Sequence, residues 1–209
     1  MALTTFSELK TAIAAWSDTS DVTAYLGDFV TLATSMLNRG GDNIPAVRAR
    51  EMVTVTDLTP TAGVCTLPTD YLQYRRVVEE ASIRRELTYI TPAVADTDYP
   101  TRDSGLANNF TIVGDSLYMF PVSSNDIELT YYQAIPDLSD SNTTNWLLDK
   151  HPNVYLHACL LQLGLFRRDD ELVSRSAQMT SALVNGLNSS DMLANYAYAP
   201  SRLRGVYIA

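Results

Sequence analysis

The sequence is short of cysteine, histidine and lysine, and each shortage excludes a class of protein. Its two cysteines, Cys65 and Cys159, lie far apart in unlike contexts, which is no disulfide framework and fits a reducing compartment. The two histidines, His151 and His157, stand on different helical faces and, with Cys159, lack the spacing of zinc ligands. We therefore predict no disulfide, no metal site and no cofactor.

Catalytic motifs are absent as well. The sequence contains no GxSxG, CxxC or HExxH motif, and a phosphate-binding loop has no support because Lys10 and Lys150 are the only lysines. Three pairs of carboxylates could serve as the acid and base of a glycosidase: Glu79-Glu80, Asp96/Asp98 and Asp169-Asp170. A solvated edge or a helix cap explains each pair more simply, so we predict that the protein is not an enzyme.

Positive charge is scarce and scattered. The chain has 15 basic residues against 24 acidic ones, a net charge of −9. Arginine pairs occur at Arg75-Arg76, Arg84-Arg85 and Arg167-Arg168, each with acidic neighbours, whereas a protein that grips phosphates needs clustered basic residues. Specific nucleic-acid binding is not expected, but an acidic wall along which DNA slides is compatible with this charge.

Long hydrophobic runs are missing too. No apolar run approaches the roughly 18 residues needed to span a bilayer, and the N-terminus MALTTFSELK lacks the pattern of a signal peptide. The 209 residues, 46% of them hydrophobic, are enough to bury a sizeable core. We expect a soluble protein made in a cytoplasm, with no membrane partner.

The aromatic residues that are present are mainly tyrosines. Twelve tyrosines stand against five phenylalanines. A tyrosine has an apolar ring and a polar tip, which suits surfaces that become half-buried at protein contacts. It also suits the strands and half-buried positions of any α+β protein, so both interpretations stay open.

The N-terminal part predicts two amphipathic helices with a tight connection. The first covers residues 5–16 and begins with a Thr5-x-x-Glu8 capping box. Its apolar stripe is predicted to consist of Phe6, Leu9, Ile13 and Trp16. The second covers residues 22–38 and ends at Gly40-Gly41. Its inner face is predicted to hold Tyr25 or Leu26, Phe29, Leu32 or Ala33, and Met36 or Leu37.

The middle of the chain alternates between β-branched and polar residues and predicts strands. Residues 52–56 and 63–67 are expected to form a β-hairpin across a Thr-Pro-Thr-Ala turn. Residues 67–72 read as a turn or a short helical piece, followed by a strand over residues 74–79 that could pair with residues 86–90.

Three further elements are predicted before the chain becomes helical again. A short helix opens at Thr91-Pro92, with threonine as the cap and proline in the first turn. Residues 109–113 and 116–120 form the clearest hairpin, because Gly114-Asp115 fits a two-residue turn. A last strand covers residues 127–132.

The C-terminal part predicts two long helices. Pro152 suits the first position of a helix whose residues 153–166 are apolar nearly all round, and such a helix is buried on every face. Asp169-Asp170 suit the start of the next helix, over residues 171–187 or beyond, which residues 188–191 either break or leave as a solvated turn. The inner positions of that helix are predicted to be Leu172, Ser176, Met179, Leu183 and Leu187.

These elements predict an α+β fold with a helical body and an inserted β module. The body comprises residues 1–46 and 136–199, with an N-terminal helical hairpin and two long C-terminal helices. A small antiparallel β module covers residues 47–135, and residues 200–209 form an extended C-terminal arm. The arm ends in an apolar tip after two arginines, and it either folds back on its own core or adds to a partner protein.

Several segments, taken together in order, resemble the head-to-tail adaptor (connector) proteins of tailed bacteriophages. The opening TTFSEL at residues 4–9 is similar to theirs, as is the LPTDYLQYRR segment at residues 67–76. The most specific matches are YYQAIPDLSD at residues 131–140 and NWLLDKHPNVYL at residues 145–156. The resemblance covers about the whole chain and is weaker over residues 39–52 and after about residue 188.

The resemblance implies a virion structural protein that works through interfaces. Members form a ring, usually of twelve copies, beneath the portal protein of the capsid. Such a ring extends the DNA channel, lets the genomic DNA pass without binding it specifically, and offers a platform for tail, nozzle or stopper proteins. The expected location is the head-tail junction of the virion, and the host cytoplasm during assembly.

Two sets of residues carry this expectation. The arm is expected to contact the portal through Arg202, Leu203, Arg204, Val206, Tyr207 and Ile208. The structural anchors of the connection between the last strand and the buried helix are expected to be Trp146, Pro152 and Tyr155. The alternatives are a virion-associated cell-wall hydrolase that uses a carboxylate pair, and a stopper or tail-completion protein.

Overall fold

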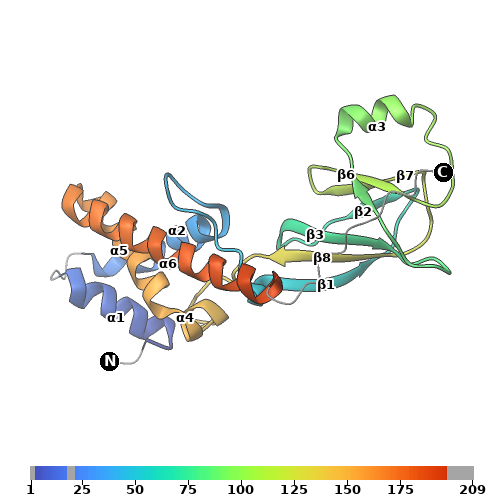
Figure 1. Cartoon of the computed structure of the whole chain (residues 1–209). Helices are drawn as coiled ribbons and strands as arrows, with labels where there is room; N and C mark the ends of the chain where they lie inside the picture. Colours follow the sequence, from blue (N-terminus) through green and yellow to red (C-terminus); the bar gives the residue numbers. More distant parts are fainter. Residues whose placement is uncertain (1–2, 18–21, 197–209) are drawn as a thin grey trace. The chain divides into compact units, whose positions relative to one another are not determined.

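The structure, a computed structural model, describes residues 3–17 and 22–196, with side chains described as far as residue 190. The chain divides into two compact units, Met1–Arg50 with Ile135–Ala209, and Glu51–Ala134. The described part of the first unit is mainly helical and the second contains all the named strands (Figure 1). The fold is therefore α+β, as predicted. The predicted arm lies outside the described residues.

Helix α1 (Phe6–Ser17) begins with the predicted capping box. The backbone N–H of Glu8 donates to Thr5 Oγ1 at 3.3 Å, and the N–H of Thr5 donates to Glu8 Oε2 at 3.1 Å. Hydrogen bonds from Thr4 and Thr5 to the Glu8 carboxylate hold its pKa below the usual value. Residues next to each other in sequence thus fix the start of this helix.

The apolar stripe of α1 is buried except at its last predicted position. Phe6, Leu9 and Ile13 are buried, but Trp16 is 63% exposed. At the end of α1 the buried residue is Ser17, four positions after Ile13, so Trp16 lies at the edge of the buried face. Including Trp16 in the stripe was therefore wrong.

Helix α2 (Leu26–Arg39) follows a 3₁₀ turn, η1 (Thr23–Tyr25), so the second helix starts later than predicted. It ends at Gly40, whose φ of +85° favours glycine. The sequence left alternatives open for its inner face, and the structure decides them. The buried positions are Leu26, Phe29, Ala33 and Leu37, whereas Tyr25 and Leu32 are exposed.

Helices α4 (Trp146–Lys150) and α5 (Pro152–Arg167) meet at His151, with Pro152 in the first turn of α5. Most of α5 is buried, because it packs against α1, α2, α4 and α6. Its last turn departs from the prediction, since Leu165 and Phe166 are 55% and 54% exposed. The prediction that this helix is buried on every face is therefore wrong for its last turn.

Helix α6 (Asp170–Tyr196) is capped by Asp169, whose Oδ1 accepts a hydrogen bond from the backbone N–H of Leu172 at 3.0 Å. Over residues 170–190, where side chains are described, its buried positions are Ser176, Thr180 and Val184. Of the predicted inner positions, only Ser176 is therefore fully buried, and Met179 is 43% exposed. Residues 188–191 neither break the helix nor form a turn.

The second unit contains two four-stranded sheets. One has the strand order β1-β8-β3-β4 and the other β2-β7-β6-β5. A short helix, α3 (Pro92–Asp98), begins at its Thr91 cap as predicted. The strands are β1 (Val53–Leu58), β2 (Val64–Thr66), β3 (Tyr71–Glu79), β4 (Arg85–Glu86), β5 (Thr88–Tyr89), β6 (Asn109–Val113), β7 (Ser116–Phe120) and β8 (Ile127–Gln133).

One predicted hairpin is wrong and one is confirmed. β1 and β2 lie in different sheets: β1 pairs with β8, and β2 pairs with β7. Each partner comes from much later in the chain, and such long-range pairings leave no local signal. The β6–β7 hairpin around Gly114-Asp115 is present as predicted.

The predicted pairing of residues 74–79 with 86–90 holds only in part. β3 starts at Tyr71, within the segment predicted as a turn, and pairs mainly with β8. Only two residue pairs join it to β4. β5 belongs to the other sheet and runs parallel to β6, so the module is not wholly antiparallel.

The core of the second unit combines residues from both sheets. Its largest buried side chains include Phe110, Leu117 and Met119 of one sheet, and Ile127 and Leu129 of the other. Burying large apolar side chains in this way stabilises the unit by roughly 1.5–3 kcal/mol each. None of the helices formed by the described residues combines the length and apolarity required to cross a membrane.

Candidate functional site

The predicted anchor Tyr155 lies at the centre of the helical unit. It is fully buried, and its hydroxyl lies 2.5 Å from Thr34 Oγ1 on α2. It also accepts a hydrogen bond from the Asn145 side-chain amide at 3.4 Å. Burial raises the pKa of Tyr155 to about 12, so the phenol stays neutral and ties α5 to α2.

Asn145 joins the segment before α4 to this centre. Its Oδ1 accepts a hydrogen bond from the backbone N–H of Leu148 at 2.9 Å and caps α4. Its Nδ2 donates to the backbone oxygen of Pro136 at 2.7 Å. The neighbouring Trp146 is half-buried, and its buried indole N–H has no hydrogen-bond partner among the described residues.

A second buried amide fixes the entry into this segment. Asn38, in the last turn of α2, accepts a hydrogen bond through Oδ1 from the backbone N–H of Ile135 at 2.9 Å. Ile135 is itself buried. Because both amides are buried and bonded, they specify one path for the chain between residues 135 and 145.

Asn188, in the stretch predicted to be a helix break or a solvated turn, belongs to α6 and binds another segment. Its Oδ1 accepts a hydrogen bond from the backbone N–H of Arg48 at 2.8 Å, and its Nδ2 donates to the oxygen of Ala46 at 2.9 Å. A polar residue that is typical of turns therefore forms hydrogen bonds to two backbone groups of another segment. No pattern in the sequence indicates this contact, which joins residues about 140 positions apart.

Exposed aromatic rings gather where α2 and α5 meet. The ring of Phe166 lies 5.2 Å from that of Tyr25 and 5.4 Å from that of Phe29, between centroids. Tyr25 and Phe166 are each about half exposed, at 47% and 54%. Large exposed aromatic side chains of this kind are enriched at protein interfaces.

The tyrosines of the second unit also lie together. Tyr74 is stacked on Tyr89 at 5.8 Å, and the edge of Phe110 meets both rings. On β8, Tyr131 donates to Asp70 Oδ1 at 2.9 Å. Tyr132 lies beneath the Arg75 guanidinium at 5.3 Å. Some tyrosines are therefore core residues and others are surface residues, so both interpretations of their number stay open.

Three acidic side chains from distant segments form an exposed cluster. Oxygen atoms of Asp57, Glu80 and Glu128 lie within 4.8 Å of one another. Arg84 donates into this cluster, with its Nη2 at 2.6 Å from Glu128 and 3.4 Å from Glu80. The Arg84 guanidinium therefore compensates part of the negative charge of the cluster. The spacing of these residues in the sequence does not indicate that they lie together.

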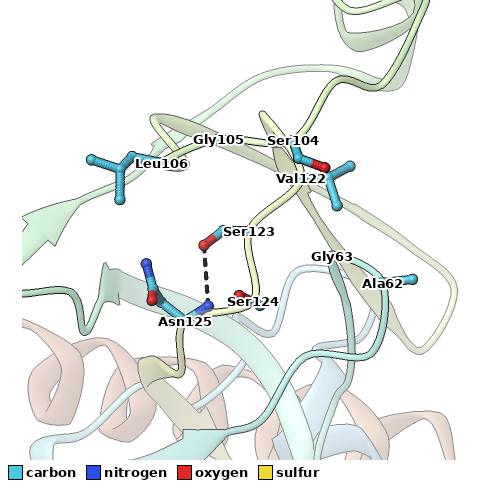
Figure 2. A pocket seen from close by; sticks show the side chains of 9 residues that line it. All are labelled: Ala62, Gly63, Ser104, Gly105, Leu106, Val122, Ser123, Ser124 and Asn125. Atoms are coloured by element: carbon cyan, nitrogen blue, oxygen red, sulfur yellow. Dashed lines mark hydrogen bonds between the residues drawn. The ribbon is translucent and has the colours of Figure 1, made fainter.

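A surface hollow lies in the second unit, between the loops around residues 62–63, 104–106 and 122–125. Its volume is about 430 Å³, and Figure 2 shows its lining side chains, which are small or uncharged. Gly105 N–H donates to the Val122 oxygen at 2.9 Å, and Val122 N–H donates to the Asp103 oxygen at the same distance. Two of the loops are thereby clamped together.

A buried carboxylate is bonded to two residues of this hollow. Glu79, at the end of β3, is fully buried. Its Oε1 accepts hydrogen bonds from Ser123 Oγ at 2.5 Å, Asn125 Nδ2 at 3.1 Å and the N–H of Ala107 at 3.2 Å. Its Oε2 is buried and has no partner among the described residues. Ser123 and Asn125 both line the hollow.

The carboxylate pairs considered from the sequence are not brought together as acid and base. Glu79, the last residue of β3, is buried, whereas Glu80 lies just after the strand, is exposed and binds Arg84. Asp169 is a helix cap. Asp96 and Asp98 are both exposed on the short helix α3.

The cysteines and histidines likewise form no common site. Burial raises the pKa of Cys65 to about 11 and also raises that of Cys159, so both thiols stay protonated at neutral pH. Burial lowers the pKa of His157, whose ring meets the edge of Trp16 at 5.9 Å. These side chains are therefore parts of the packing.

A comparison with protein-family models matches residues 4–204 to the family described as SU10 adaptor protein. The match spans both units and nearly the whole chain. A comparison with curated proteins gives no match. The resemblance drawn from the sequence motifs is thus confirmed at the level of the family.

Proposed function

Because the chain belongs to the SU10 adaptor protein family, a family of phage head-tail adaptors, we propose that it forms a ring beneath the portal. The ring, of about twelve copies, extends the DNA channel and is the platform for tail, nozzle or stopper proteins. The family match over residues 4–204 is the observation that carries this proposal. The protein then acts at the head-tail junction of the virion, after synthesis in the host cytoplasm.

The surface of the chain supports a role in binding rather than catalysis. The exposed rings of Tyr25 and Phe166 suit a protein contact, whereas Asp169 caps a helix and Glu80 binds an arginine. We therefore propose that the function is structural. Many modest contacts around a ring would give durable attachment through avidity.

Assembly on purified portal rings tests this proposal. The free chain, of 23.1 kDa, should sediment as a monomer, and mixing it with portal should give a ring in electron micrographs. Free chain that leaves the portal bare would contradict the adaptor role. Release of fragments from peptidoglycan by the purified chain would instead favour the hydrolase.

The C-terminal arm is the proposed portal contact. The residues concerned, from Arg202 to Ile208, lie outside the described part of the chain, and the proposal stands on their sequence. Truncation after Pro200 should leave the fold intact and abolish portal binding. A truncated chain that still assembled on portal rings would contradict this role.

A further inference from the structure

We propose that the hollow beside Glu79 binds an arginine side chain of a partner protein, with the Glu79 carboxylate as its counter-charge. This site is independent of how many copies form the ring. It is defined entirely by residues of the second unit, whose loops and strands are shown around the hollow in Figure 2.

The Glu79 carboxylate is incompletely compensated within the part of the chain that the structure describes. Glu79 is fully buried, and the ion pairs found between described residues do not include it. Removing a charged carboxylate from water costs several kcal/mol unless hydrogen bonds and an opposite charge compensate it. The three donors on Oε1 supply part of this compensation, and Oε2 receives none.

The Glu79 carboxylate lies close to the hollow. Two of its three donors, Ser123 and Asn125, line the hollow, and the third, Ala107, follows the lining residue Leu106. Figure 2 shows the Ser123 hydroxyl and the Asn125 amide on the same side of their loop. The carboxyl group therefore lies next to two side chains that line the hollow, and a guanidinium that binds it takes the place of the Asn125 amide.

The lining of the hollow suits a guanidinium group. The nine lining residues include three serines and one asparagine and carry no basic side chain. A guanidinium has five N–H donors, so it can pair with the carboxylate while donating to neighbouring hydroxyl and amide oxygens. The hollow, with a volume of about 430 Å³, has room for such a side chain.

The shape of the hollow depends on a glycine. Gly63 has φ +78°, and a Cβ built there would lie 2.8 Å from Val122 Cγ1. A larger residue at this position would push the loop of residues 122–125 and disturb the donors to Glu79. The shape of the hollow and the hydrogen bonds to Glu79 therefore both depend on the position of the loop of residues 122–125.

A peptide titration of the full chain tests the proposal. The probes are two capped tripeptides, Gly-Arg-Gly and Gly-citrulline-Gly, which differ in charge but hardly in shape. We expect saturable amide shifts at Ala107, Ser123 and Asn125 with the arginine peptide, and binding of the citrulline peptide weaker by about tenfold or more. Equal responses to both peptides would overturn the proposal without using any variant.

Two matched variants sharpen the test. Glu79→Gln keeps an oxygen for the three donors and removes the charge, so it should weaken binding of the arginine peptide by about tenfold. Glu80→Gln removes the same charge one residue later, from an exposed position, and should change binding less than about twofold. Undiminished binding by Glu79→Gln, or an equal loss with Glu80→Gln, would show that the buried carboxylate is not the counter-charge.

Discussion

At the scale of single residues, the helical unit depends on polar groups buried between its helices. Tyr155 is bonded to Thr34 and Asn145, which lie on α2 and at the start of α4. A buried hydrogen bond contributes about 1 kcal/mol net, but leaving a partner unsatisfied costs about 1–3 kcal/mol. Tyr155 therefore affects stability through the partners it satisfies as much as through its apolar ring.

Tyr155→Phe tests this account. The substitution keeps the ring and leaves the Thr34 hydroxyl with one partner fewer, so the free energy of unfolding should fall by about 1–3 kcal/mol. Urea denaturation followed by circular dichroism measures the change. Tyr25→Phe, at an exposed position, is the matched control and should change stability by less than about 0.5 kcal/mol. Equal effects at both positions would contradict the prediction.

The same hydroxyl predicts how stability depends on alkaline pH. Tyr155 has a pKa of about 12 in the folded chain and about 10 when unfolded, so the unfolded chain loses its proton first. The stabilisation is fully present below pH 10 and is lost as the pH rises through about 12, by up to about 2–3 kcal/mol. Stability curves from pH 8 to 12 should therefore fall less steeply for Tyr155→Phe than for the unchanged chain. Parallel curves would show that this phenol does not titrate as described.

At the scale of elements, tight turns hold the strands of the second unit in register. Gly63 precedes β2, and its backbone oxygen accepts a hydrogen bond from the Met119 N–H on β7 at 3.0 Å. Gly114, in the β6–β7 turn, has φ +58° with open space around it. A side chain at Gly114 would therefore meet only backbone strain, whereas a side chain at Gly63 would meet backbone strain and a steric clash.

Alanine at each of these glycines gives a paired prediction. Gly114→Ala should cost only the strain of a left-handed backbone, about 1–2 kcal/mol. Gly63→Ala adds a clash with Val122 and should cost about 1–3 kcal/mol more. Denaturation midpoints of the two variants give the comparison. A Gly63→Ala variant no less stable than Gly114→Ala would show that the loop of Val122 moves freely.

The elements that sequence predicted well are those with local causes. The Thr5/Glu8 capping box, the Thr91 cap and the Gly114-Asp115 hairpin each depend on residues a few positions apart. The false hairpin of β1 and β2 failed because both strands pair with partners from later in the chain. The Glu79 arrangement was missed for the same reason, since its donors lie at residues 107, 123 and 125.

At the scale of the whole molecule, the charge of the chain constrains what it can hold. The chain carries −9, and two of its exposed arginines are already engaged: Arg84 with Glu80 and Glu128, and Arg76 with Glu86. Arg75 lies over the ring of Tyr132. Phosphate binding depends on clustered basic side chains, and pairing with carboxylates weakens their attraction for DNA.

An adaptor of this charge should let DNA pass without retaining it. The purified chain should therefore not shift a duplex of about 30 base pairs in a gel at about 0.15 M salt, where basic DNA-binding proteins are retained even without a specific sequence. The triple variant Asp57→Asn, Glu80→Gln, Glu128→Gln removes three negative charges around the single guanidinium of Arg84 and creates no cluster of basic side chains, so it should leave the duplex unshifted under the same conditions. Salt-resistant binding by the unchanged chain would show that the protein binds DNA directly. It would contradict the proposal that DNA passes through the ring without being bound.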